Sequence, residues 1–418
     1  MRPFVRACAA LSALALAGGV FTGPTAAAAS PEIGCAWQFM SDATTLNVAF
    51  PDASATYWVL PYALVDGDRI TVHGWYPYAR YMSLNTYGTD FDTVDTLRDD
   101  EIAPDPGSGN PFADPAAAGL PPDARRWQVT VTTGTADRSR NEISALPTAP
   151  GAQRVPVGFL IVRVYVPDDP QSLPGSVPLP EVSLTRAGRT VSIPTCRAPF
   201  DPSSLPGGPI DTAATDAFDA VIASAAAGAF PGDVPEATFV NPASTSGLFP
   251  NGDNKYVGAG LTHQPGRIVV VRGRAPTFPD TGAGVPPAAP GTDVRYWSMC
   301  QNDQVSPYPV VACAADHQTR VDDSGFYTYV VAAPADLPPR AATDPTVTVL
   351  PWGSTEVPKK VLFLRHMLPS AQFYPRSVQA SQAQGSDPAV TMGDYYPRAA
   401  YCATETFQSG GWRACLGG

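Results

Sequence analysis

The chain of 418 residues contains an internal repeat that constrains its fold more than any other feature. When the sequence is shifted by 199 positions, residues 50–77 align with residues 249–276 without a gap. Seven of these 28 positions are identical, and Asp52 aligns with Asn251. Self-similarity at a fixed offset indicates that one structural unit is used more than once. We therefore predict two diverged copies of one domain.

Both copies have the residue pattern of an all-β protein. Short runs rich in Val, Ile, Tyr, Trp and Thr alternate with clusters drawn from 47 prolines and 36 glycines, which is typical of many short strands. The order of these runs is the same in both copies, so we predict two tandem, duplicated β-sandwich or jelly-roll-like domains. The predicted strands are 56–60, 69–75, 79–86, 127–133 and 159–166 in the first copy, and 267–271, 326–332 and 361–368 in the second.

The predicted domain boundaries follow the repeat. Between the copies, a Pro/Gly/Ser-rich linker leads into a helix predicted at 211–227, where Phe218, Val221 and Ile222 share one face at helical spacing. The predicted divisions are a signal peptide (1–29), a first β-sandwich domain (30–198), the linker and helix (199–230), a second β-sandwich domain (231–390) and a looped, disulfide-held tail (391–418).

The first 29 residues have the three parts of a secretory signal peptide. Arg2 and Arg6 provide a positive start, residues 9–20 are apolar, and small residues at 26–29 precede the expected cleavage. The apolar run is too short to span a bilayer, and no later run offers about 18 apolar residues. Cys8 precedes the apolar run, whereas the cysteine of a lipoprotein would follow it. We therefore predict a secreted protein without a lipid anchor.

The charge balance argues against two classes of partner. Without Arg2 and Arg6 the chain has 25 basic and 38 acidic residues, a formal charge of −13. An acidic chain without a basic cluster is not expected to bind nucleic acid or an anionic membrane. The partners that remain are a small molecule, a glycan or another component of the cell envelope.

Six cysteines follow the signal peptide, and an even number in an oxidising compartment favours disulfides. Six cysteines can pair in 15 ways. The absence of a C-x-x-C pair and of histidines at ligand spacing argues against zinc. The spacing favours two local bonds and one that brackets the first copy: Cys300–Cys313, Cys402–Cys415 and Cys35–Cys196.

An acidic segment at 90–112 distinguishes the first copy from the second. Clustered carboxylates in a loop can bind Ca²⁺, and the candidate ligands here are Asp99, Asp100 and Asp105. The segment lacks the spacing of an EF-hand, and Arg98 interrupts its charge, so a solvated acidic loop is the alternative. No other cofactor is expected.

Two arginines occupy the same place in equivalent apolar runs, Arg163 in the first copy and Arg365 in the second. A guanidinium in such a strand needs a carboxylate, carbonyl groups or a polar cavity around it. The two interpretations are a structural ion pair inherited by both copies and recognition of an anion or carboxylate. Together with Arg80, Tyr81 and Asn85, these arginines form the predicted ligand-binding set.

No catalytic motif is present. Four histidines occur, none at the spacing of a metal site, and G-x-S-x-G, P-loop and dinucleotide-binding patterns are absent. The leading hypothesis is a non-catalytic extracellular binding protein with its site at the loop edge of residues 80–112 or between the copies. The alternatives are a secreted hydrolase or isomerase with Arg365 and His366 as catalytic residues, and a structural envelope protein.

Distinctive motifs extend over nearly all of the mature chain. They are RYWSMC (295–300), LPWG (350–353), RHMLP (365–369) and MGDYYP (392–397), with LRDDEI (97–102) and RVYVP (163–167) in the first half. With these motifs the chain resembles a family of secreted bacterial proteins, common in actinobacteria and generally described as hypothetical. More distantly, both halves are similar to tandem β-sandwich domains of unknown function in bacterial envelope proteins. The resemblance implies a secreted two-domain β architecture with a disulfide between Cys300 and Cys313, and it implies no activity.

Overall fold

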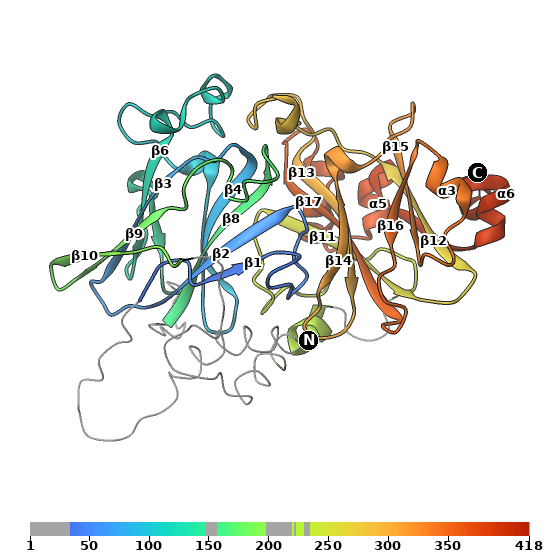
Figure 1. Cartoon of the computed structure of the whole chain (residues 1–418), viewed down its shortest axis with the longest axis horizontal. Coiled ribbons are helices and arrows are strands. Elements are labelled where there is room, and N and C mark those ends of the chain that lie inside the picture. The colour runs from blue at the N-terminus through green and yellow to red at the C-terminus, as the bar shows by residue number, and fades with distance from the viewer. Residues whose placement is uncertain (1–33, 148–156, 198–219, 221–222, 230–234, 418) are drawn as a thin grey trace.

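The computed structural model describes residues 34–147, 157–197, 220, 223–229 and 235–417. Its strands form four sheets, two in each copy (Figure 1). The all-β prediction with two tandem, duplicated sandwich domains is confirmed. The predicted signal peptide and most of the predicted linker lie outside the described residues.

The first copy consists of two five-stranded sheets. In spatial order, one sheet contains β1 (Phe39–Ser41), β2 (Ala55–Ala63), β8 (Val157–Pro167), β4 (Ala79–Tyr87) and β5 (Thr93–Arg98). The other contains β10 (Arg189–Ile193), β9 (Glu181–Arg186), β3 (Arg69–Trp75), β6 (Arg126–Thr132) and β7 (Glu142–Ser144). Short 3₁₀ helices lie in the connections: η1 (Asp99–Glu101), η2 (Pro115–Ala117), η3 (Pro122–Ala124) and η4 (Arg138–Arg140).

The second copy consists of two four-stranded sheets. One contains β11 (Asn254–Thr262), β17 (Lys359–Pro369), β13 (Val294–Asp303) and β14 (Val310–Ala315). The other contains β16 (Val347–Pro351), β15 (Phe326–Ala332), β12 (Arg267–Arg274) and β18 (Arg398–Ala403). The helices are α3 (Pro339–Thr343), α4 (Val378–Gln384), α5 (Pro388–Met392), α6 (Thr404–Leu416), η6 (Thr281–Ala283), η7 (Asp316–Gln318), η8 (Tyr374–Arg376) and η9 (Gly393–Tyr395).

The copies share one strand order once β1 and β10 of the first copy are set aside. The equivalent pairs β2–β8 and β11–β17 are antiparallel, and each copy also has one parallel pair, β6–β7 or β15–β16. Equivalence extends to single residues, because Tyr57 lies opposite Arg163 and Tyr256 lies opposite Arg365. The duplication is therefore visible in pairing register as well as in sequence.

Each copy buries its own hydrophobic core between its two sheets. Two equivalent glycines make room for aromatic side chains there. A Cβ atom on Gly74 would lie 2.4 Å from the ring of Trp127, and one on Gly273 would lie 2.5 Å from the hydroxyl of Tyr327. Any larger residue would displace the aromatic ring from the core, which explains why both copies retain glycine at this position.

Every strand predicted from the sequence is present, but two segments differ from the prediction. The acidic segment 90–112 is not all loop, because it contains β5, which pairs with β4 and buries Leu97 completely. The C-terminal tail is not looped either. Its strand β18 pairs with β12, and its helix α6 buries Phe407. In both segments, backbone pairing and one well-buried side chain outweigh a polar composition.

Three further predictions concern covalent links and helices. All three disulfides favoured by the spacing are present, Cys35–Cys196, Cys300–Cys313 and Cys402–Cys415. Of the helix predicted at 211–227, residues 220 and 223–227 are helical and the helix continues to 229, while the remainder lies outside the described residues. Among the described helices, none has the length and apolar character needed to cross a membrane.

The sheets that contain β8 and β17 face each other across the interface between the copies (Figure 1). A buried apolar cluster links them and includes Tyr81 and Tyr165 from the first copy with Tyr296 and Met367 from the second. Residues on one face of β8 and β17 therefore enter the cores, and residues on the other face enter this interface.

Candidate functional site

Arg163 on β8 and Arg365 on β17 both extend into the interface between the copies. The structure brings these two predicted residues together at one cavity. Each side chain is almost fully buried, because the residues are 4% and 2% exposed respectively. A buried guanidinium is strongly destabilising unless its charge is compensated, so the partners of the two arginines decide what this region does.

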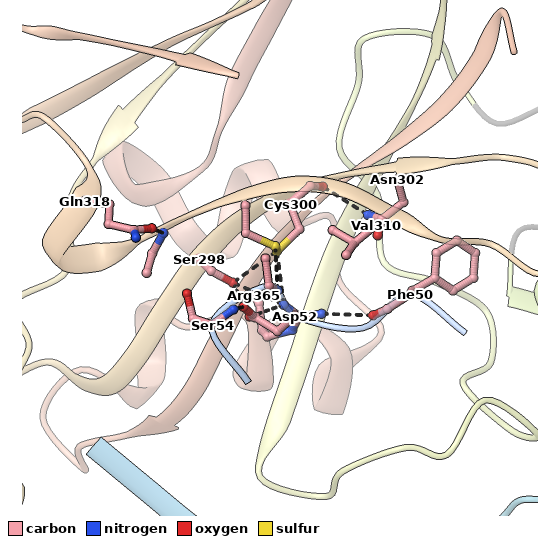
Figure 2. Close-up of a disulfide and its surroundings, with 12 residues drawn as sticks. Phe50, Asp52, Ser54, Ser298, Cys300, Asn302, Val310, Gln318 and Arg365 are labelled. Atoms are coloured by element: carbon pink, nitrogen blue, oxygen red, sulfur yellow. Dashed lines mark hydrogen bonds and ion pairs between the residues drawn. A yellow bond between two sulfur atoms is a disulfide. The ribbon is translucent and has the colours of Figure 1, made fainter. Parts of the chain in front are cut away.

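Arg365 is paired with a carboxylate of the other copy. Its Nη1 donates to Asp52, with which it forms an ion pair, to Ser298 Oγ at 3.2 Å and to Cys300 Sγ at 3.3 Å (Figure 2). Its Nη2 donates to the carbonyl oxygen of Phe50 at 3.4 Å. Burial opposes the charge on Arg365, but Asp52 and nearby tyrosines outweigh it and raise the pKa of the guanidinium. Arg365 is therefore a neutralised structural cation.

Arg163 has no such partner. Its Nη2 donates to the Tyr87 hydroxyl and to the carbonyl oxygen of Phe249 at 2.7 Å, and its guanidinium lies 5.2 Å from the centroid of the Tyr57 ring. Within the described ranges, no carboxylate lies at ion-pair distance from it, and its buried Nε has no hydrogen-bond partner. Arg163 is thus a buried cation whose charge the described residues do not balance.

The difference between the two arginines has a single origin in the sequence. The carbonyls of Phe50 and Phe249 receive the two guanidinium groups, and both phenylalanines have positive φ, at 57° and 50°. Asp52 then accepts from the Tyr296 hydroxyl at 2.9 Å. At the equivalent position, Asn251 donates to the Tyr81 hydroxyl at 3.1 Å. An amide therefore replaces the carboxylate in the half of the interface that contains Arg163.

Two adjoining cavities, of about 80 and about 50 Å³, lie beside these arginines. Arg365 lines both, and Arg163 lines the larger one. Apolar side chains and three tyrosines supply most of the remaining walls: Leu46, Val48, Ala49, Phe50, Tyr57, Val59, Ile161, Tyr165, Leu248, Phe249, Tyr256 and Phe363. Few polar groups in an apolar cavity are typical of small-molecule sites.

Two of the tyrosines at the cavity, Tyr57 and Tyr165, are protonated near neutral pH. Burial raises the pKa of both Tyr57 and Tyr165, and their hydroxyls lie 3.1 Å apart. A protonated hydroxyl can donate to an anion, as can the guanidinium groups. With two arginines and one carboxylate, Asp52, the site has a local charge of +1. It is suited to one monoanion.

The other three predicted ligand-binding residues serve the interface rather than the cavity. Arg80 is fully buried and its Nη1 lies 2.9 Å from Asp316 of the second copy. Tyr81 donates to Asp253 at 2.7 Å, and Asn85 donates to Thr96 Oγ1 at 2.8 Å. Each of these residues donates a hydrogen bond between or within the copies, although Nη2 of Arg80 has no hydrogen-bond partner among the described residues. Arg80, Tyr81 and Asn85 do not line the cavities beside Arg163.

The predicted calcium ligands have separate partners. Asp99 accepts from the backbone N–H of Met82 at 2.7 Å, and burial raises its pKa to about 7. Asp100 pairs with Arg98 at 2.9 Å, and Asp105 lies 3.0 Å from His73. Among the described residues, these three carboxylates do not form a group of ligand atoms within 4.8 Å of one another. Calcium binding there stays a prediction without support from the geometry.

Potential ligand atoms of three other residues do lie within 4.8 Å of one another, those of Asp52, Cys300 and Cys313. Both sulfurs are joined in a disulfide, and Arg365 lies against the carboxylate (Figure 2). Metal ions bind thiolates rather than disulfide sulfurs, and a guanidinium repels a cation. This set is therefore part of the Arg365 ion pair.

His366 does not join Arg365 in one site. The two side chains lie on opposite faces of β17, as adjacent strand residues must. The His366 ring packs against Phe373, and its Nδ1 accepts from the N–H of Val378 at 3.5 Å. Burial lowers its pKa to about 3, so it is neutral. His366 lines neither cavity at the interface.

Sequence reasoning missed Asp52, which pairs with Arg365, and the cavity-lining tyrosines Tyr57, Tyr165 and Tyr256. One signal for them was available. The aligned pair Asp52 and Asn251 differs in charge within the most similar part of the repeat. Such a difference at an otherwise matched position marks a place where the copies perform different tasks.

Comparisons with known proteins find similar folds and give no information about the site. The structure is similar to the crystal structure of an uncharacterized protein from Burkholderia cenocepacia, with 14% identity and a TM-score of 0.54, over 96% of this chain and 88% of that one. Another similar structure is the VPA0106 protein from Vibrio parahaemolyticus, with 12% identity and a TM-score of 0.38, over 85% of this chain and 90% of that one. No family model and no curated protein matches the chain. The Burkholderia likeness supports a shared fold alone.

Proposed function

We propose that this protein is a secreted, non-catalytic binding protein that holds one small carboxylate between its two copies. The observation that carries the proposal is Arg163, a buried cation that lines an apolar cavity without a counter-charge among the described residues. Leaving such a charge unpaired costs several kcal/mol. A bound carboxylate would remove this penalty and accept from the free Nε.

The cavity also limits the ligand. Its apolar walls favour an aliphatic body, and its net charge of +1 favours a single carboxylate. The two volumes, about 80 and 50 Å³, fall below the roughly 150 Å³ engineered cavity that binds benzene. The ligand we propose is therefore a short aliphatic monocarboxylate, smaller than a single-ring acid.

Secretion and domain division are part of the same proposal. The three disulfides favour an oxidising compartment, in agreement with the signal peptide predicted at residues 1–29. The divisions at 30–198, 199–230, 231–390 and 391–418 complete the proposed organisation. The sequence motifs support membership of the family of secreted bacterial proteins that the chain resembles.

The test is calorimetric titration of the oxidised protein with acetate, butyrate and hexanoate. Butanol and butylamine serve as neutral and cationic controls of similar shape. We expect binding by at least one acid and by neither control. At 100 times its dissociation constant, that acid should stabilise the protein by about 2.7 kcal/mol, which is a shift of several degrees in melting temperature.

Two variants assign the binding to Arg163. Arg163→Gln should weaken acid binding at least tenfold, since it removes a charge-assisted hydrogen bond. Asn251→Asp should do the same while preserving Arg163, because it places a carboxylate in the Arg163 half at the position where Asp52 neutralises Arg365 in the other half. Unchanged affinity in both folded variants, or binding of butanol as tight as that of butyrate, would contradict the proposal.

A further inference from the structure

The second copy has an open groove away from the interface, where the equivalent segment of the first copy lines a pocket of only about 10 Å³. After the central strand, the first copy reaches its next strand through residues 168–180, whereas the second uses the longer segment 370–397 with η8, α4, α5 and η9. This segment and the end of β12 enclose a groove of about 360 Å³. Its volume lies within the range of small-molecule sites.

Two arginines from different elements converge on this groove. The guanidinium of Arg274, at the end of β12, lies 6.0 Å from the centroid of the Tyr395 ring, and that of Arg376 lies 5.3 Å from the same centroid. Both guanidinium groups therefore line the groove beside the same tyrosine ring. Such cation–π contacts orient a guanidinium but do not neutralise it.

Both arginines are exposed, and neither is paired with a carboxylate in the part of the chain that the structure describes. Across the described residues, no hydrogen bond from the guanidinium of Arg274 or Arg376 is seen. Asp394 lines the groove without pairing with either arginine. The groove thus has a local charge of +1 on a chain whose formal charge is −11.

The chemistry of these groups indicates one kind of ligand. Two planar guanidinium groups with unused N–H donors can bind a tetrahedral oxyanion through several charge-assisted hydrogen bonds. The Asp394 carboxylate can accept from hydroxyls on the rest of the ligand. We propose that this groove binds the phosphate group of a phosphorylated polyol or sugar, either as a free molecule or within a polymer.

The experiment uses the full oxidised protein and calorimetric titration at low ionic strength, since exposed charges are screened by salt. The probes are glycerol 3-phosphate, glycerol and a poly(glycerol phosphate) chain. We expect glycerol 3-phosphate to bind at least tenfold more tightly than glycerol. A tighter affinity for the polymer, per phosphate group, would identify a polymer as the source of the ligand, and an equal affinity would identify the free molecule.

Variants locate the site. Arg274→Gln with Arg376→Gln should weaken glycerol 3-phosphate binding at least tenfold, and lysine at both positions should restore part of it through charge alone. The control replaces the exposed Arg69 and Arg189 by glutamine, which makes the same change in net charge and should leave binding unchanged. Equal affinity for glycerol and glycerol 3-phosphate, or equal loss in the control, would overturn the proposal.

This groove is independent of the carboxylate cavity. A protein saturated with its monocarboxylate should bind glycerol 3-phosphate with unchanged affinity, and the Arg163→Gln variant should do so as well. Failure of the carboxylate proposal would therefore leave this one standing.

Discussion

Asp52 of the first copy neutralises Arg365 of the second, whereas the equivalent Asn251 leaves Arg163 without a carboxylate partner in the described structure. The two halves of the interface otherwise match closely. Each half has a phenylalanine carbonyl that accepts from the arginine and a tyrosine hydroxyl at the Asp or Asn position. The exchange of a carboxylate in Asp52 for an amide in Asn251 therefore distinguishes the structural ion pair of Arg365 from the candidate anion site at Arg163.

Replacement of Asp52 by Asn should destabilise the protein strongly. It leaves Arg365 buried and unpaired, and breaking a buried pair in this way typically costs about 3–5 kcal/mol. Urea denaturation measures the loss. The control is Asp123→Asn, which removes an exposed carboxylate and should change stability by less than about 0.5 kcal/mol. A similar small change for Asp52→Asn would show that the ion pair contributes nothing.

Asp99 should make the protein less stable as the pH rises toward 7. Burial raises its folded pKa to about 7 from an ordinary 3.8. The folded state therefore keeps a proton that the unfolded state releases, and this stability is present below pH 3.8 and lost as the pH rises through 7. Burial raises the pKa of Asp168 and Asp253 too, which adds to the same slope.

The measurement for Asp99 is the free energy of unfolding at pH 5 and pH 8. The Asp99→Asn variant should show a smaller decline between these values than the wild type. Asp123→Asn again serves as the control and should keep the full slope. Parallel pH profiles for Asp99→Asn and the wild type would refute the role of this carboxyl group.

His366 should make the protein less stable as the pH falls, which is opposite to the effect of Asp99. Burial lowers its folded pKa to about 3, so the unfolded state binds a proton below pH 6.5 and the folded state does not. Stability is lost as the pH falls from 6.5 toward 3. His366→Gln retains an acceptor for the Val378 N–H and should resist acid better in thermal melts at pH 4 to 6.

The same variant separates the two functional hypotheses. Carboxylate binding should be unchanged in His366→Gln, because His366 lies on the face of β17 opposite Arg365. Loss of binding, or of any turnover found for these acids, with the fold intact would instead favour the hydrolase or isomerase hypothesis.

The disulfides should contribute unequally. Cys35–Cys196 spans 161 residues and Cys402–Cys415 spans 13, and a longer loop loses more entropy in the unfolded chain. Serine substitution of the first pair should cost about 5 kcal/mol and of the second about 3 kcal/mol in this picture. Urea midpoints of the two double variants provide the comparison. A larger loss for the short-loop pair would contradict the entropic explanation.

Much of the fold was predictable because the relevant signals are local. The period-two pattern of Arg69–Trp75 and the apolar run around Arg163 define strands without reference to partners. Strand β5 was missed because the carboxylates in and around it suggested a loop, while the burial of Leu97 that stabilises it depends on pairing with β4. Local composition predicts a strand only when apolar and polar side chains alternate along it, as they do in Arg69–Trp75.

The site was predictable only in part, since it depends on how the copies pack. Arg163 and Arg365 were recognisable as charges in apolar strands. Their different partners were not, because Asp52 is 313 positions from Arg365 in the sequence. The calcium hypothesis shows the converse difficulty. Asp99, Asp100 and Asp105 are neighbours in sequence, but the fold directs each to a different backbone or side-chain partner.

The matched interface between the copies has an evolutionary consequence. In a symmetric homodimer, every substitution appears in both subunits, so a carboxylate lost beside one arginine is lost beside both. Joining the two halves in one chain lifts that restriction. Asp52 can neutralise Arg365 while Asn251 leaves the charge of Arg163 available for a ligand. Two similar domains can therefore form a single site, with one orientation for its ligand.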